Sequence, residues 1–148
     1  IFEAEDYATN YKIRELDYRL LYTPDTIVWH YRRPTPKKFF KQIYRYAIGR
    51  LIIGKKDREM INLVHILVGF GIPILLGLSL LLIFVNLYWF LYFLSFVFLF
   101  LAIYFLLAWF KIKSLKAALW MPPTIAILFS AWSAGFLREL ISPIKSRK

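Results

Sequence analysis

The sequence contains no cysteine, and this absence excludes several kinds of site. Without thiols, the chain of 148 residues can form neither a disulfide framework nor a zinc–thiolate centre, and it offers no thiol nucleophile. Acidic residues are also scarce: 9 Asp and Glu stand against 20 Lys and Arg, for a net charge of +11. This balance favours partners that carry negative charge, such as an anionic membrane surface or a nucleic acid.

Charged residues are absent from the whole of residues 61–110. Residues 1–60 hold 13 Lys and Arg with 8 Asp and Glu, and residues 111–148 hold 7 Lys and Arg with 1 Glu. Fifty consecutive uncharged residues rule out a purely soluble fold, and they exceed the roughly 20 apolar residues that one bilayer crossing needs. We therefore expect two spans, 61–85 and 87–110, with a turn at Asn86. An apolar block of this size argues against nucleic acid as the partner.

A third apolar run, 117–137, leaves the topology open. Residues 32–58 carry 10 Lys and Arg and a single acidic residue, so the N-terminal part is expected in the cytoplasm. The basic stretch 111–116 matches a hairpin that returns to the same side. A third crossing would place the basic tail outside, whereas Pro122 and Pro123 permit a re-entrant or interfacial segment instead.

The N-terminal third combines helix and strand signals. Residues 4–16 predict a short polar helix, and residues 18–22 and 26–30 are rich in β-branched and aromatic residues, which predicts two short strands around a turn at 23–25. Thr35 and Pro36 are typical of a helix start, and the predicted helix runs to about Ile53. Its apolar and basic faces predict that it lies in the membrane interface.

Three groups of side chains can carry chemistry. Glu5 and Asp6 open a helix, where the helix dipole keeps a carboxylate ionised and suited to act as a general base; ordinary charge at a helix N-terminus is the alternative. Gln42, Arg45 and Tyr46 share one helix face, on which they can hold a diphosphate or stack on a sugar, or Arg45 can simply meet lipid headgroups. His30 can ligate a metal or contact a phosphate, or it can be structural.

The order of these segments resembles the C-terminal part of membrane-bound family-2 glycosyltransferases. Those enzymes show a Glu-Asp pair opening a helix, a Gly-Tyr strand, a Pro-x-x-x-Val-x-His strand and a Gln-x-x-Arg-Trp-like motif before the membrane helices. Here Glu5-Asp6, Asp17-Tyr18, the run from Pro24 to His30, and Gln42 to Tyr46 follow in that order. Asp17 stands in place of the family's Gly, and Tyr46 in place of its Trp. The resemblance covers residues 1–58 in motif and 59–148 in layout.

The resemblance implies a function and assigns roles to the residues. Such an enzyme transfers a sugar from a nucleotide-sugar donor to a lipid-linked or polysaccharide acceptor at the cytoplasmic face of the plasma membrane. By analogy, Asp6 is the catalytic base with Glu5 in support, and Gln42, Arg45 and Tyr46 border the donor diphosphate. His30 would lie near a divalent cation, Mg or Mn. The alternative is a non-enzymatic membrane anchor or partner subunit with a basic cytoplasmic face.

The expected fold class is an α+β remnant of a GT-A domain followed by helical membrane segments. Residues 1–35 would be the end of the glycosyltransferase domain, 36–58 the basic interface helix, and 59–148 the membrane region. The chain begins at Ile1 without Met and contains no Asp-x-Asp motif. We therefore expect a fragment that lacks the nucleotide-binding half, holds the cation mainly through residues elsewhere, and is inactive alone.

Overall fold

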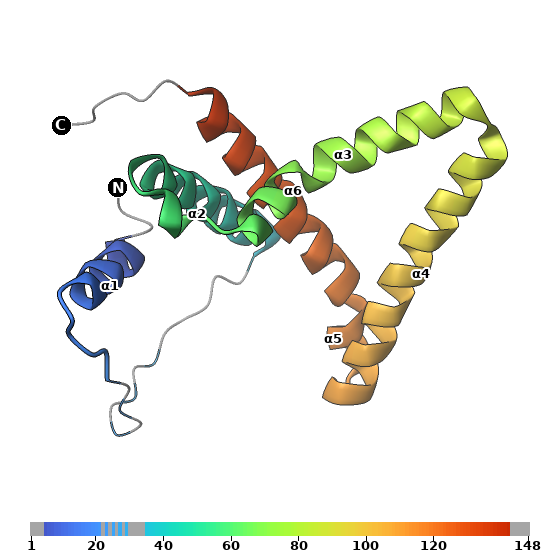
Figure 1. The fold of residues 1–148 in the computed structure, drawn as a ribbon. Helices are drawn as coiled ribbons and strands as arrows, with labels where there is room; N and C mark the ends of the chain where they lie inside the picture. Colours follow the sequence, from blue (N-terminus) through green and yellow to red (C-terminus); the bar gives the residue numbers. More distant parts are fainter. Residues whose placement is uncertain are drawn as a thin grey trace.

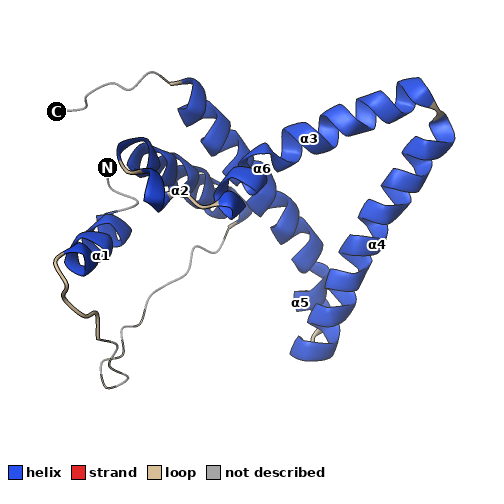
Figure 2. Ribbon diagram, in the orientation of Figure 1, coloured by secondary structure: helices blue, strands red, loops and turns tan. Residues whose placement is uncertain are grey.

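A computed structural model shows how these segments fold. It describes the backbone of residues 5–21, 23, 25, 27, 29 and 35–142, and the side chains of those from residue 9 onward. The described elements are all helical (Figure 2). In chain order they are α1 (Glu5–Glu15), α2 (Pro36–Lys56), the 3-10 turn η1 (Arg58–Met60), α3 (Leu63–Val85), α4 (Leu87–Ile112), α5 (Leu115–Leu119) and α6 (Met121–Ile141).

The two predicted strands are not observed, so the prediction of an α+β fold is wrong for the part of the chain that the structure describes. Residues 18–21, 23, 25, 27 and 29 are not in a strand, and the remaining residues of the two segments lie outside the described ones. The described apolar side chains of these segments do not pack in a core: Leu21 and Trp29 are 92% and 91% exposed. Strand preference depends on such a half-buried surface, and two strands alone are barely stable.

Helix α1 ends in a left-handed turn at Asp17. The backbone N–H of Asp17 donates to the carbonyl of Arg14, and that of Tyr18 donates to the carbonyl of Ile13. Asp17 itself has a φ of 60°, the conformation that glycine adopts most easily after a helix and that Asp tolerates. Asp17, which stands where the glycosyltransferases that the sequence resembles have Gly, therefore occupies a backbone position that favours Gly.

Helix α2 begins as the sequence predicts. The Thr35 side chain accepts a hydrogen bond from the Lys38 backbone, and Pro36 takes the first helical position, where a missing N–H costs nothing. The helix then continues to Lys56, three residues beyond the predicted end. Its buried residues are small or aliphatic: Ala47, Gly49, Leu51, Ile53 and Gly54.

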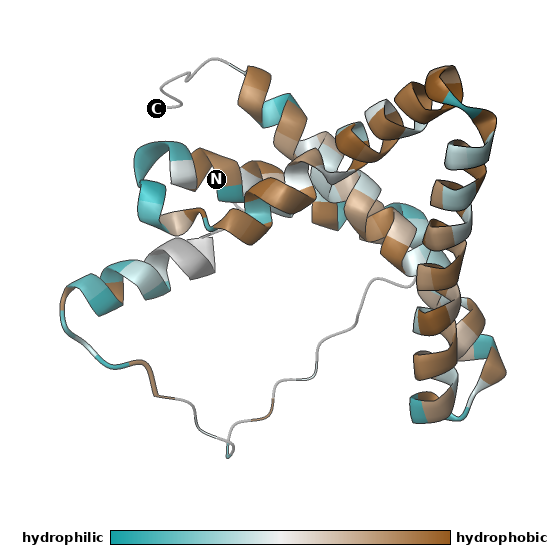
Figure 3. Cartoon of the chain, turned by 45° about the vertical axis from the view of Figure 1, so that its right-hand side comes forward, coloured by the Kyte–Doolittle hydropathy of each residue, from teal (hydrophilic) through white to brown (hydrophobic). Residues whose placement is uncertain are grey.

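Helices α3 and α4 form a hairpin joined by Asn86 alone. Asn86 ends α3 and caps α4, because its side chain accepts from the Tyr88 backbone at 2.8 Å. Among the described residues, three helical segments are long and apolar enough to cross a membrane: Leu63–Val85, Leu87–Ile112 and Leu115–Ile141. Figure 3 shows the apolar colouring along all of them, in contrast to the hydrophilic α1. The chain is thus a membrane protein, as the charge pattern predicts.

Helix α6 packs against α2, α3 and α4. The α3–α4 hairpin forms a V, and α6 runs from the end of α4 across the first part of α3 to α2 (Figure 1). The small core lies at this crossing, where Ala47, Leu51 and Phe136 are buried and Ile61, Phe70 and Trp132 pack against them. Most of the remaining surface of α3 and α4 is apolar and exposed, as expected for helices surrounded by lipid.

Candidate functional site where helices α2 and α6 meet

The predicted binding residues share one face of α2. The Gln42 side chain donates a hydrogen bond to the Tyr46 hydroxyl at 3.0 Å, which orients both groups across one helical turn. Arg45 lies beside them and is half-buried, while Tyr46 is 42% exposed. The structure therefore brings together an amide and a phenol next to a guanidinium on an accessible surface. Such a set can contact phosphate oxygens and the face of a sugar.

Helix α6 brings a further cation to α2, on the side of the helix opposite to Gln42 and Tyr46. The Arg138 guanidinium donates to the Tyr44 hydroxyl at 3.0 Å, and its central carbon lies 5.8 Å from the centroid of the Tyr44 ring. Phe40 stacks on the same ring at 6.3 Å. Arg138 is 94 residues from Tyr44 in sequence, so only the packing of α6 against α2 shows the pair.

The backbones of α2 and α6 come very close to each other at Gly135. A Cβ placed on Gly135 would lie 2.2 Å from the carbonyl oxygen of Tyr44 and 3.1 Å from the Cβ of Ala47. Neither neighbour is the end of a flexible side chain. Gly135 is therefore required here because the two helices are too close for any side chain to fit.

A lysine joins the ends of the same two helices. Lys55 donates to the Glu139 carboxylate at 3.2 Å, to the Ser142 carbonyl at 3.0 Å and to the Glu139 carbonyl. The Lys55 and Glu139 side chains are only 18% and 13% exposed. Lys55 thus satisfies carbonyls that the end of α6 leaves open, at the end where the helix dipole favours a cation.

Replacing Lys55 with Met is expected to lower the free energy of unfolding by about 1–2 kcal/mol, since three charge-assisted contacts are lost while the aliphatic stem is kept. Amide hydrogen exchange in the last turn of α6 should accelerate. The matched control is Lys41→Met, which removes an exposed lysine from the same helix. Equal exchange rates in the two variants would show that Lys55 does not secure this helix end.

Two contacts join α3 and α6 where these helices cross. The Ser133 hydroxyl is buried and donates to the Gly69 carbonyl at 2.7 Å. The Trp132 indole donates to the His65 carbonyl at 3.2 Å and stacks on the His65 ring. The His65 Nδ1 accepts from the Asn62 backbone and completes the cap of α3, which agrees with a structural role for this histidine.

The predicted catalytic pair lies in the first turn of α1. Glu5 and Asp6 are described there by their backbone only. The described contact between α1 and the membrane part is made by Tyr11, whose hydroxyl donates to the Glu59 carboxylate at 3.0 Å. This bond raises the pKa of the Tyr11 phenol above its ordinary value. The contact places α1 beside the η1 end of α2, whereas Tyr46 lies ten residues before Lys56, about 15 Å along the helix.

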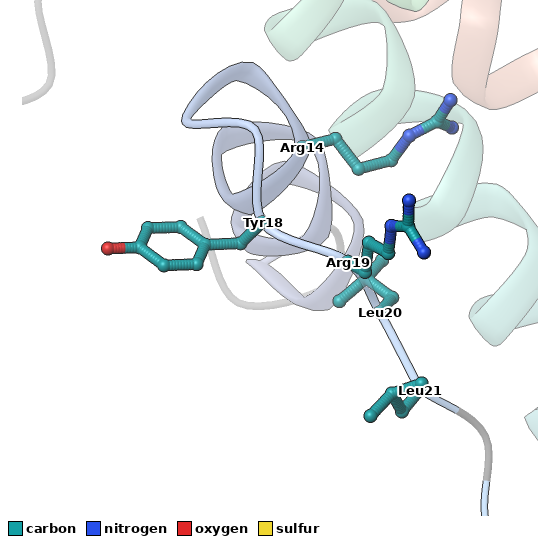
Figure 4. A pocket seen from close by; sticks show the side chains of 5 residues that line it. All are labelled: Arg14, Tyr18, Arg19, Leu20 and Leu21. Carbon is teal, nitrogen blue, oxygen red and sulfur yellow. The ribbon is translucent and has the colours of Figure 1, made fainter.

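A shallow cavity of about 470 Å³ follows the end of α1. Arg14, Tyr18, Arg19, Leu20 and Leu21 line it, and both guanidinium groups extend to the side opposite the Tyr18 ring (Figure 4). Arg14 and Arg19 stand on either side of the left-handed turn at Asp17, and helical or strand spacing alone does not predict that they share a side.

The predicted metal residue His30 lies outside the described residues. Among the residues that are described, no group of three or more His, Asp or Glu side chains could hold a metal ion. A divalent cation therefore stays a prediction that rests on the resemblance alone.

Comparison with known proteins adds no assignment. No protein-family model, no curated protein and no solved structure matches the chain.

Proposed function

We propose that this chain is the membrane-embedded, acceptor-side part of a family-2 glycosyltransferase. It would transfer a sugar from a nucleotide-sugar to a lipid-linked or polysaccharide acceptor at the cytoplasmic face of the plasma membrane. The observation that carries the proposal is the backbone at Asp17. The family that the sequence resembles has Gly after the first helix, and in this chain Asp17 at that position has a φ of 60°, a conformation that Gly adopts most easily.

The roles follow the chemistry of sugar transfer. The Asp6 carboxylate, with Glu5 in support, accepts the proton of the acceptor hydroxyl as it attacks the anomeric carbon, and the nucleotide diphosphate departs. Negative charge grows on the diphosphate, and Arg45 with Gln42 and Tyr46 would stabilise it from α2. The sequence contains no Asp-x-Asp motif, so Mg or Mn and the nucleotide would be bound mainly by residues outside these 148.

The packing of α2 supports an acceptor that is anchored in the membrane. The Gln42–Tyr46 face lies on the helix that precedes the α3–α4 hairpin, and Arg138 joins α2 from the end of α6. A lipid-linked acceptor presents its phosphate and first sugars at the headgroup level. Arginine side chains and an exposed tyrosine at that level suit such a substrate.

A second candidate, a non-enzymatic anchor or partner subunit, is favoured by one observation. The contacts of Lys55, Gly135 and Ser133 all join helices to one another, and such contacts are what a membrane anchor requires. An anchor needs neither Asp6 nor the Gln42–Tyr46 face, so an activity assay separates the two candidates.

The assay uses membranes from cells that express the protein from its complete coding sequence. Radiolabelled nucleotide-sugars are supplied one at a time, and label is counted in the lipid and polysaccharide fractions. We expect transfer that depends on Mg or Mn, and at least a tenfold loss in Arg45→Ala. Lys41→Ala removes the same charge from an exposed position of α2 and is expected to keep the rate. Labelling no greater than in membranes without the protein, for every donor, would favour the anchor.

A further inference from the structure

The hairpin fixes which helix ends share a membrane face. Helices α3 and α4, of 23 and 26 residues, extend for about 35 and 39 Å, enough to cross the hydrocarbon core of roughly 30 Å. Because Asn86 alone joins them, α4 must return to the face from which α3 starts. Leu63 and Ile112 therefore lie at one face, and Asn86 lies at the other.

Helix α6 contacts the α3–α4 hairpin on the Leu63 and Ile112 side. Its second half meets the start of α3 through Trp132 and Ser133, and its last turn meets Lys55, which precedes α3. Its beginning follows the end of α4 through the short α5 and packs against α4 there. In Figures 1 and 3 the junction of α3 and α4 lies away from α6.

Because α6 is a continuous helix, few orientations relative to the membrane are open to it. It is an unbroken helix from Met121 to Ile141, about 31 Å long, with Pro122 and Pro123 in its first turn. A re-entrant segment would have to turn back within the membrane, and α6 does not turn. A crossing helix of this length would carry its end to the Asn86 face, whereas the end of α6 is held by Lys55 at the opposite one.

We infer that α6 lies in the plane of the membrane face from which α3 starts. Together with α2 it forms a platform in the phospholipid headgroup layer. The platform exposes apolar side chains on α6, of which Ile141 is 82% and Leu140 is 45% exposed, and these suit the upper acyl chains. The exposed cations around it, which suit lipid phosphates, are Lys37, Lys38, Lys41, Lys111, Lys113, Lys116 and Arg138. The inference does not depend on the proposed enzymatic function.

The absence of cysteine allows a direct test of the side on which α6 ends. Single cysteines are introduced as Lys116→Cys, Ser142→Cys and Asn86→Cys, and right-side-out and inverted vesicles are labelled with a membrane-impermeant maleimide. We expect Ser142→Cys to react from the same side as Lys116→Cys, and Asn86→Cys to react only from the other. Leu87→Cys replaces Asn86→Cys if loss of the cap prevents accumulation. Labelling of Ser142→Cys from the Asn86 side would overturn the inference.

Depth measurements test the orientation of the helix independently. Ala134 and Ile141 are both exposed on α6 and lie seven residues apart, about 10 Å along the helix and on nearly the same side of it. Spin labels at Ala134→Cys and Ile141→Cys are compared by oxygen and nickel relaxation in vesicles of phosphatidylcholine and phosphatidylglycerol. An in-plane helix gives two similar, shallow depths. A label at Ala134→Cys that lies about 10 Å deeper than the one at Ile141→Cys would show that α6 crosses the membrane.

Discussion

Replacing Gly135 with Ala is expected to lower the free energy of unfolding by about 2 kcal/mol. The new Cβ would lie 2.2 Å from the Tyr44 carbonyl oxygen, so α2 and α6 must move apart. Such overpacking typically costs 1–3 kcal/mol, and it outweighs the roughly 1 kcal/mol by which Ala favours a helix over Gly. Separation of the helices also weakens the Arg138–Tyr44 and Lys55–Glu139 contacts. Unfolding in mixed micelles with increasing sodium dodecyl sulfate, followed by tryptophan fluorescence, measures the change.

The chain offers a matched control for this substitution. A Cβ at Gly77 in α3 would meet no atom within 4 Å. Gly77→Ala is therefore the same chemical change in a helix without the close approach, and we expect it to leave stability unchanged or slightly raised. If both variants unfold at the same detergent fraction, α2 and α6 do not pack as described.

Replacing Asp6 with Asn is expected to slow sugar transfer by about 10²- to 10⁴-fold, the usual contribution of a general base. The amide keeps the size of the side chain but cannot accept the proton of the acceptor hydroxyl. Because proton transfer occurs in the chemical step, kcat should fall while KM for the nucleotide-sugar stays nearly constant. The rate is measured in the membrane assay, with the saturating donor that gives transfer in the unaltered protein.

Asp17→Asn serves as the control for Asp6→Asn. It makes the same replacement eleven residues later, at a position with a φ of 60° that Asn adopts as readily as Asp. We expect this variant to keep the unaltered rate. A loss of less than threefold in Asp6→Asn, with transfer otherwise intact, would remove Asp6 from the role of base. The glycosyltransferase proposal itself would then need a different carboxylate.

Local signals in the sequence were sufficient for the helices of the membrane part. The fifty uncharged residues, the polar Asn86 between two apolar runs, and Thr35 followed by Pro36 each act within a few residues or through composition, and the observed α2, α3 and α4 agree with them. The prediction of two strands was wrong because it, too, used only local signals. Their prediction used the preference of side chains such as Ile27 and Trp29, but a strand also needs neighbouring strands and a core, which no short stretch of sequence supplies.

In the candidate site, too, some residues follow from local spacing and others only from the packing of the helices. Gln42, Arg45 and Tyr46 lie on one face of α2 because helical spacing places them there, and the sequence showed this directly. Helical spacing could not predict the contact of Arg138, because 94 residues separate it from Tyr44. Its position near the end of an apolar helix does not identify its partner until the packing of the helices is known.

The sequence by itself determined that the chain enters a membrane, because the burial of uncharged residues in lipid depends only on composition and length. It also determined where the main helices start and turn, since caps and hairpins are local. Only the tertiary structure decided how α6 sits, why Gly135 must be glycine, and which carbonyls Lys55 satisfies. Each of these depends on contacts between helices that are distant in sequence, and their geometry is set by the packing of all the helices together.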